Sequence, residues 1–354
     1  MKKIVTLAIA ITLVLLQIAC RISGLNIDTR NVIQGSGKVV EEVRPLKSVN
    51  QVTLATLGNL QIKIGEEESL VIRADENIIS EIRSDVDPQG MLTIEIAPNV
   101  GINPISEISY VLTVKALKGI HLTSLGSAEA GTLKGADFAL SVLGSGSLKI
   151  EELDVDGPVE LTLASLGNAT IDRLSATKLL AEVNSSGTAS ISGEVDQAEI
   201  SVSSLGSFEG SALQIQSSEP AQVKLTTYGS GSIRTGDILA TKGVSLEATS
   251  LGNIDTGTIE TAELSTTISG SGSVNIDGGN ADRIDAHLSS LGSFDARKLN
   301  CQAADITISG SGSAHLTVEK LINARLSSLG SLFYRGNPTL DVEVSGTGEV
   351  KSDQ

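Results

Sequence analysis

The chain has few of the residues that build aromatic cores, disulfide frameworks and metal sites. Aromatic residues make up 2% of its 354 residues and Trp is absent, so small branched side chains must fill the core. The same shortage removes the flat rings that polysaccharide sites usually offer. Of the two cysteines, Cys20 ends a leader-like segment, which leaves Cys301 without an intrachain disulfide partner.

Positive charge is also scarce. The chain carries 42 acidic residues against 26 Lys and Arg, which gives a formal net charge of −16. A surface of this sign repels the phosphates of nucleic acids and anionic lipids. We therefore expect no nucleic-acid partner.

A long hydrophobic run occurs only at the N-terminus. Two lysines precede an apolar run at residues 4–16, which is typical of a secretory leader and is short for a membrane span. The following pair Ala19-Cys20 resembles the end of a bacterial lipobox, in which the cysteine is lipidated, although Gln17 stands where Leu is usual. We expect a lipoprotein signal peptide over residues 1–20, lipidation at Cys20 and membrane attachment through that lipid. Plain secretion is the alternative.

The residues after Cys20 bear on localisation. Arg21 stands where an acidic residue would favour retention in an inner membrane, so a cell with two membranes would carry the protein on its outer membrane or surface. Residues 21–34 are polar and show no pattern. They predict a short tether.

A short sequence repeat dominates the rest of the chain. Each copy turns on a glycine, and the glycines recur at a nearly constant interval, as in 292 − 272 = 20: Gly126, Gly146, Gly167, Gly187, Gly206, Gly231, Gly252, Gly272, Gly292, Gly312, Gly330 and Gly348. Eight of the eleven intervals lie between 19 and 21. A fixed period of this length indicates a solenoid. Helical solenoids need longer repeats, and the consensus of leucine-rich repeats is absent.

The pattern inside each repeat predicts strands. Four residues before the glycine (position −4), eleven of twelve copies are apolar, with Thr227 the exception. At position +2 all twelve are apolar, from Ala128 to Val350, whereas position −5 is polar in every copy. Period two inside period twenty describes short strands with one buried face. We therefore expect an all-β, right-handed parallel β-helix of roughly fifteen rungs, with the −4 and +2 columns buried throughout.

The residue before each glycine alternates between large and small. It reads Leu125, Ser145, Leu166, Ser186, Leu205, Ser230, Leu251, Ser271, Leu291, Ser311, Leu329 and Thr347. With rungs about 4.8 Å apart, a full column of leucines would be crowded at a glycine corner. The alternative is a 40-residue turn with two unlike halves. The likeness of the apolar columns in every copy favours the 20-residue turn.

Residues 35–120 are less regular than the repeats at 121–350. Alternation predicts strands at residues 52–64, 69–74, 92–97 and 109–114, and Gly58 stands in an early copy of the corner motif. The segment Asp75–Asp85 has isoleucines at helical spacing, which predicts a helix that caps the first rungs, since solenoids need atypical terminal repeats.

Several motifs together resemble a known family. They are Gly35-Ser36-Gly37 before a strand pair, Ala74-Asp75-Glu76-Asn77, Met91-Leu92-Thr93-Ile94, the strand Tyr110-Val111-Leu112-Thr113-Val114, the serial Gly-Ser-Gly-Ser rungs and the closing Tyr334-Arg335-Gly336-Asn337-Pro338. They resemble the bacterial family called putative auto-transporter adhesin, head GIN domain, over residues 35–350. Leu-Gly in every other rung departs from the usual Gly-Ser-Gly. The resemblance implies an exported right-handed β-helix, often a lipoprotein, with no established activity and no functional residues to carry over.

The residues offer no candidate for catalysis, a cofactor or a metal. The three histidines sit at outward positions, and His121 and His287 are eight rungs apart, about 38 Å. The outward column at position +3 carries mixed charge, which indicates a solvated ladder. Asp277–Asp282 superficially resembles a calcium-binding repeat but occurs once, so we interpret it as a turn. Cys301 is expected to pack as a small hydrophobe.

The remaining feature is a long acidic surface tiled with Ser, Thr and Gly. It favours a non-catalytic surface adhesin or binding scaffold, whose partner is an unknown surface protein or polysaccharide. Two alternatives stay open: a carbohydrate-active β-helix enzyme, since β-helices also carry polysaccharide lyases, and a self-associating structural protein of the envelope. The one long interval, from Gly206 to Gly231, has a single carboxylate, Glu219, in its extension.

Overall fold

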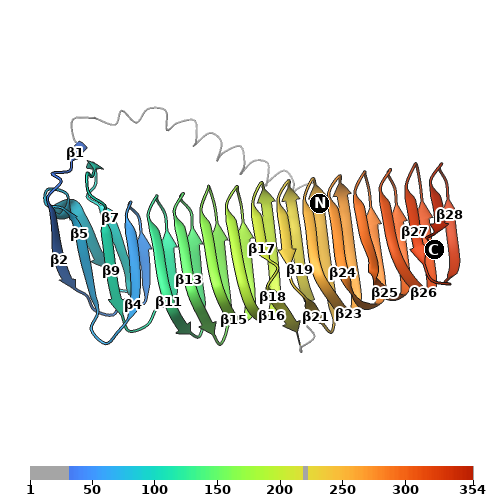
Figure 1. Ribbon diagram of the computed structural model, residues 1–354, viewed down its shortest axis with the longest axis horizontal. Helices are drawn as coiled ribbons and strands as arrows, with labels where there is room; N and C mark the ends of the chain where they lie inside the picture. The colour runs from blue at the N-terminus through green and yellow to red at the C-terminus, as the bar shows by residue number, and fades with distance from the viewer. Residues whose placement is uncertain (1–31, 218–221, 354) are drawn as a thin grey trace.

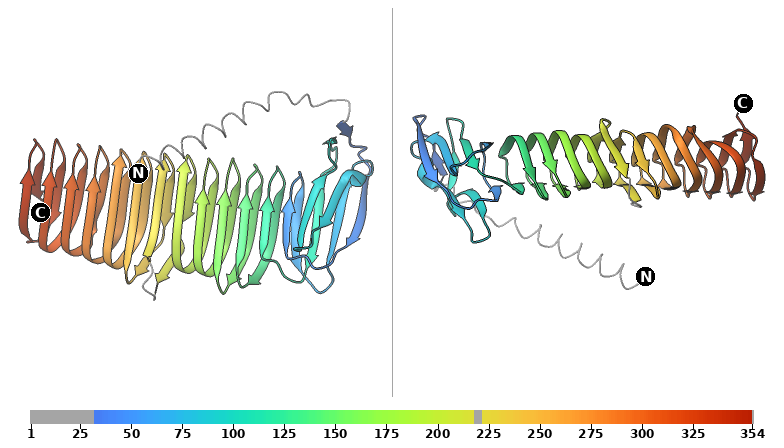
Figure 2. Two further views of the ribbon diagram at one scale, coloured as in Figure 1. Left: turned by 180° about the vertical axis from the view of Figure 1, so that it is seen from behind. Right: turned by 90° about the horizontal axis from the view of Figure 1, so that it is seen from below.

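The protein is a long β-solenoid in which strands stack along one axis (Figures 1 and 2). The computed structural model describes residues 32–217 and 222–353. Each turn has two strand columns joined at an upper corner, and at the lower edge many strands bend and continue into the next column (Figure 1). The described residues contain no helix long and apolar enough to cross a membrane.

The two columns differ in their relation to the glycine corner. The column before the corner contains β3 (Gln51–Leu54), β10 (Gly119–Leu122), β12 (Phe138–Val142), β14 (Pro158–Leu163), β19 (Gln222–Gly229), β22 (Gly243–Ser250) and β28 (Thr339–Val344). The column after it contains β4 (Asn59–Ile64), β11 (Ser127–Gly135), β13 (Ser147–Val155), β17 (Ser207–Gly210), β20 (Ser232–Thr235), β27 (Ser331–Arg335) and β29 (Glu349–Ser352).

Six strands run through the lower bend and serve both columns. They are β15 (Asn168–Val183), β16 (Thr188–Ser204), β23 (Asn253–Gly270), β24 (Ser273–Leu288), β25 (Ser293–Ile308) and β26 (Ser313–Leu326). The short strands β18 (Leu213–Ser217) and β21 (Ile238–Ala240) lie at the same lower edge. The segment Asp277–Asp282, which the sequence predicts as a turn, does not interrupt β24.

The strand register settles the length of a turn. Parallel pairing aligns Asp285 with Asp305 and Leu288 with Ile308, so one turn of the solenoid corresponds to one copy of the repeat. The 40-residue alternative is therefore excluded. The solenoid has about eleven turns, fewer than the fifteen predicted, because β2 (Val39–Pro45), β5 (Ser69–Asp75) and β6 (Ile82–Val86), which precede residue 119, pair only in antiparallel fashion and add no parallel rung.

The predicted core columns are buried, with two exceptions in the last copy: Val344 at position −4, and Val350 at position +2, which is only partly buried. Leu122, Leu288 and their equivalents at position −4 face inward, and Thr227 is buried among them with no exposure. Val344 is 41% exposed, contrary to the prediction, because no described turn follows to cover it. At the outward −5 position, Thr226 is buried as well.

The N-terminal part is built differently from the repeats. Its strands are β1 (Val32–Gln34), β2 (Val39–Pro45), β5 (Ser69–Asp75), β6 (Ile82–Val86), β7 (Met91–Ile96), β8 (Gly101–Asn103) and β9 (Ser109–Val114). Antiparallel pairs join β2 to β5, β5 to β9 and β6 to β7, whereas β3 and β4 pair in parallel with β10 and β11. The expected strand at 52–64 is thus two strands joined by the corner at Gly58.

The helix predicted at Asp75–Asp85 is wrong. The segment contains the end of β5, one 3₁₀ turn at Ile79–Glu81 and the start of β6. Ile78, Ile79 and Ile82 are all buried, and no side chain caps the turn. The three isoleucines are therefore buried in the N-terminal core without forming an α-helix. After the single 3₁₀ turn the chain becomes extended, and β6 pairs with β7.

Candidate functional site

The glycine corners bring successive turns into close backbone contact. A Cβ atom on Gly146 would overlap the carbonyl oxygen of Gly126, and one on Gly272 would overlap that of Gly252. In the leucine-bearing turns the obstacle is instead the −4 side chain of the preceding turn, such as Val183 beneath Gly206, 2.6 Å from the added atom. Glycine is needed in both kinds of turn because any side chain would separate the rungs.

The leucines that precede these glycines point into solvent. We call this set the leucine ridge, and its members are 57–68% exposed: Leu125, Leu166, Leu205, Leu251, Leu291 and Leu329. These leucines are therefore exposed side chains. The expected crowding of leucines inside a glycine corner does not occur. The sequence alone could have predicted this exposure. Position −1, like the outward position −5, is an odd number of residues from the glycine and so belongs to the outward face.

A row of uncharged polar side chains runs beside the leucine ridge. At position +1 the residues, which we call the hydroxyl ladder, are Ser127, Ser147, Asn168, Thr188, Ser207, Ser232, Asn253, Ser273, Ser293, Ser313 and Ser331. Neighbouring rungs hydrogen-bond: the Ser147 hydroxyl donates to that of Ser127 at 3.1 Å, and the Ser273 hydroxyl donates to Asn253 Oδ1 at 2.9 Å.

The +3 column has mixed charge and is internally paired, as a solvated ladder would be. Arg234 lies 3.4 Å from Glu209 and 3.5 Å from Asp255, and Asn275 donates a 2.7 Å hydrogen bond to Asp255. These groups are exposed, so each pair contributes little to stability. The hydrogen bond from Arg297 holds the pKa of Asp295 below its usual range.

The three histidines have separate environments. Nε2 of His121 donates to Gln51 Oε1 at 3.2 Å, and its Nδ1 accepts from the Ser141 hydroxyl at 2.8 Å. His287 is paired with Asp285 at 3.3 Å, and His315 stacks on Phe333 with ring centroids 4.7 Å apart. Across residues 32–217 and 222–353, no group of three or more His, Cys, Asp or Glu could hold a metal ion.

Two buried titratable groups, Asp75 and Cys301, have surroundings that suit a structural role. Asp75 accepts hydrogen bonds from the amides of Ile105 and Ser106 at 2.9 and 3.2 Å, and these donors, with the Ser106 hydroxyl foremost, keep its pKa below the usual range. Cys301 is fully buried in β25, and burial raises the pKa of its thiol to about 11. Neither group is poised for proton transfer or nucleophilic attack near neutral pH.

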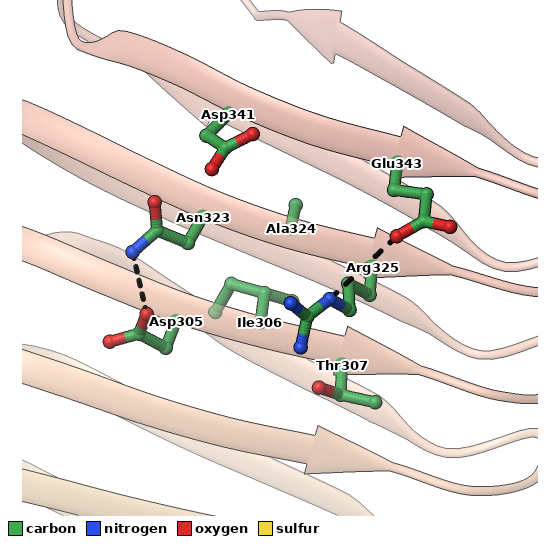
Figure 3. Close-up of a pocket in the computed structure, with 8 residues that line it drawn as sticks. All are labelled: Asp305, Ile306, Thr307, Asn323, Ala324, Arg325, Asp341 and Glu343. Atoms are coloured by element: carbon green, nitrogen blue, oxygen red, sulfur yellow. Dashed lines mark hydrogen bonds and ion pairs between the residues drawn. The ribbon is translucent and has the colours of Figure 1, made fainter.

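One hollow on the sheet faces is a shallow trough of about 280 Å³ across β25, β26 and β28 (Figure 3). Asn323 donates a 2.8 Å hydrogen bond to Asp305, which is also paired with Arg283, and Arg325 lies 3.8 Å from Glu343. Two of its three carboxylates, Asp305 and Glu343, therefore face partners already in place, and the third belongs to Asp341. The trough could accept a polar group of a ligand, but it offers no acid and base held on opposite sides of a reacting atom.

Several predictions fall on residues outside the described part of the chain. They are the signal peptide at 1–20 with the lipidation site Cys20, residues 21–31 of the tether, and Glu219 of the long interval.

The family can now be identified. The family described as putative auto-transporter adhesin, head GIN domain, matches residues 49–221 and 220–338. The chain belongs to this family. No curated protein matches it.

Solved structures of bacterial proteins resemble the GIN-domain chain at low identity. A putative adhesin from Bacteroides fragilis NCTC 9343 is 15% identical, with a TM-score of 0.39, over 91% of this chain and 100% of that one. A putative adhesin from Parabacteroides merdae ATCC 43184 is 17% identical, with a TM-score of 0.29, over 92% and 100%. A putative lipid binding protein from Parabacteroides distasonis ATCC 8503 is 16% identical, with a TM-score of 0.29, over 91% and 100%.

Proposed function

We propose that this GIN-domain protein is a non-catalytic adhesin or binding scaffold of the cell surface, held to a membrane by a lipid on Cys20. The family and its adhesin description support export and a surface role. The Ala19-Cys20 pair after the apolar run at residues 4–16 supports the anchor. The partner we propose is a polymer or surface protein that lies along the sheet faces.

The observation that carries the proposal is the regularity of those faces. Outward side chains recur once per turn, as when His121 bonds Ser141 and Arg234 bridges Glu209 and Asp255. Several of the charges are paired with neighbours on adjacent turns, as Lys134 is with Asp154 and Lys298 with Asp277, so each turn presents a weak and similar contact. Many linked weak contacts give strong binding through avidity, whereas a catalytic site would need one turn unlike the others.

The chemistry of the faces predicts how binding behaves. Hydroxyls at position −5, such as Ser141, Thr267 and Thr307, can hydrogen-bond a partner without any change in charge. Binding through them should depend weakly on salt, because screening acts on charges. It should weaken stepwise as successive turns lose their hydroxyl.

The test measures binding of the purified protein to intact cells and to immobilised surface polysaccharides. Ser141→Gln, Thr267→Gln and Thr307→Gln are introduced one, two and three at a time, and binding should fall at each step. The matched control places Ser211→Gln, Thr261→Gln and Asn300→Gln at the lower edge, where binding should persist. Equal loss in both series, or complete loss with one substitution, would contradict the scaffold.

A second assay addresses catalysis directly. Incubation with uronate polymers, with and without calcium, should give no turnover. Turnover that disappears in Glu343→Gln, in the trough, or in Glu219→Gln would favour the carbohydrate-active enzyme instead.

A further inference from the structure

The upper edge of the solenoid is almost free of charge. We define the edge strip as the five positions from −3 to +1 at each of the twelve pivotal glycines, and only Glu349 among them is charged. Charged residues form 19% of the whole chain, so an average strip of this size would hold about eleven. The sheet faces on either side carry the charge, at positions such as −5 and +3.

The same strip carries much of the exposed apolar surface. Of the sixteen large hydrophobic residues exposed in the described part of the chain, eight lie in the strip: the six of the leucine ridge, Leu143 and Tyr228. The ridge leucines recur every second turn, about 9.6 Å apart, and span about 48 Å. The upper loops that hold them follow a nearly straight line (Figure 1). Exposed apolar groups in such a continuous arrangement mark an interaction surface.

The described chain begins beside this edge. Strand β1 lies at the end of the row of upper loops (Figure 1), with Val32 43% and the nearby Ile105 63% exposed. Val32 is 32 − 20 = 12 residues from Cys20, and twelve residues reach at most about 40 Å. A lipid on Cys20 would therefore hold the membrane within reach of the edge strip.

We propose that the edge strip rests on the surface of the membrane that holds the anchor, with the leucine ridge inserted at the level of the upper acyl chains. The inference rests on the lipid anchor of the proposed function. A straight line of side chains can meet a plane at all points at once, and the hydroxyl ladder then lies among headgroups, which it can hydrogen-bond. The acidic faces would stand away from the bilayer and remain open to a partner.

The distribution of charge favours lipid over a second copy of the chain. A row one side chain wide offers little of the broad packed core that a stable protein interface needs, about 800 Å² from each partner. The absence of charge along the strip suits a surface where buried charge would be costly. The net charge of −16 further favours neutral over anionic headgroups.

The experiment places a polarity-sensitive fluorophore on either edge of one turn of the full-length exported protein. Leu291→Cys labels the ridge and Asn300→Cys the opposite edge, while the buried Cys301 stays unlabelled. The labelled protein is reconstituted into phosphatidylcholine vesicles, some of which carry nitroxide lipids. Flotation with the vesicles is measured first, because it reports the anchor alone. The label at 291 should then shift to the blue and be quenched by nitroxide, and the label at 300 should not.

The ridge variant is Leu166→Ser, Leu251→Ser and Leu329→Ser together. It should fold, because serine occupies the same position in alternate turns such as Ser145 and Ser271. Quenching at 291 should fall several-fold while flotation persists. The matched control, Ile64→Ser, Leu239→Ser and Leu340→Ser, removes exposed apolar residues outside the strip and should leave quenching unchanged.

The outcomes separate the two proposals. Flotation with a water-exposed label at 291 would overturn the edge contact and leave the anchor standing. Absence of flotation would overturn both. A label at 291 that is shielded equally without lipid, and more strongly at higher protein concentration, would show a second copy of the chain on the ridge and overturn the membrane contact.

Discussion

The amide of Ser271 donates a 2.7 Å hydrogen bond to the carbonyl oxygen of Ser250, one turn earlier. The same carbonyl would be overlapped by a Cβ atom on Gly270, the residue before Ser271. Ser311 with Ser290 and Thr347 with Ser328 repeat this relationship, each at 2.8 Å. The alternation of Ser-Leu-Gly turns with Gly-Ser-Gly turns thus follows from a close backbone approach that favours glycine two residues before the pivotal glycine in every second turn, with Ser185 the one exception.

Gly270→Ala should destabilise the protein by about 1–3 kcal/mol, since the added methyl must push two turns apart. The urea midpoint of unfolding measures the change. Gly131→Ala is the control, because a Cβ there meets only Glu151 Oε2 at 3.8 Å and the backbone is unstrained. Equal effects at both sites would show that the contact at the corner is not what glycine serves.

Thr227→Val should stabilise the protein by about 1–2 kcal/mol, because the Thr227 side chain is fully buried and its hydroxyl has no hydrogen-bond partner in the structure. Valine removes this unsatisfied polar group at nearly constant volume. Thr162→Val, at a half-exposed outward position, should change the urea midpoint little. A loss of stability in Thr227→Val would mean that its hydroxyl is satisfied after all.

Leu288→Asp should divide unfolding into two transitions. Leu288 is 1% exposed, and an unpaired carboxylate in its place would cost several kcal/mol. Because each turn of a solenoid contacts only its neighbours, a defect at Leu288 uncouples the turns before it from the turns after it. Circular dichroism during urea unfolding checks this, with the outward Thr307→Asp expected to keep a single transition.

Lowering the pH below about 6.5 should remove stability through His121. Burial lowers the pKa of this imidazole in the folded protein, so the unfolded chain takes up a proton first. The contribution of His121 is therefore complete above pH 6.5 and is lost as the pH falls towards the folded pKa. In His121→Gln this part of the pH dependence should disappear, whereas His287→Gln, at an exposed position of the same column, should retain it.

Lipid attachment should depend on Cys20. Labelled palmitate should enter the wild-type protein in its native host and should not enter Cys20→Ser. Cys301→Ser serves as the control and should be labelled like the wild type. Equal labelling of wild type and Cys20→Ser would instead indicate a different lipid site, and the absence of label from both would indicate plain secretion.

Much of the fold follows from local pattern alone. Inward residues such as Leu288 and outward ones such as His287 alternate in every copy, and strand geometry converts that alternation into one buried and one exposed face. The regular spacing of the glycines then requires turns that stack in register. Neither step needs knowledge of contacts between distant residues.

The N-terminal part and the corners depended on tertiary contacts. The isoleucines at 78, 79 and 82 fit a helix by spacing, and although β6 and β7 form a hairpin across residues 87–90, only the folded N-terminal core shows that all three isoleucines are buried. The leucine ridge shows the same limit. Its period is visible in the chain, yet only the stacking of Gly270 against the Ser250 carbonyl explains why leucine alternates with serine, and only the assembled edge shows that these leucines line up in solvent, because both depend on residues a full turn apart.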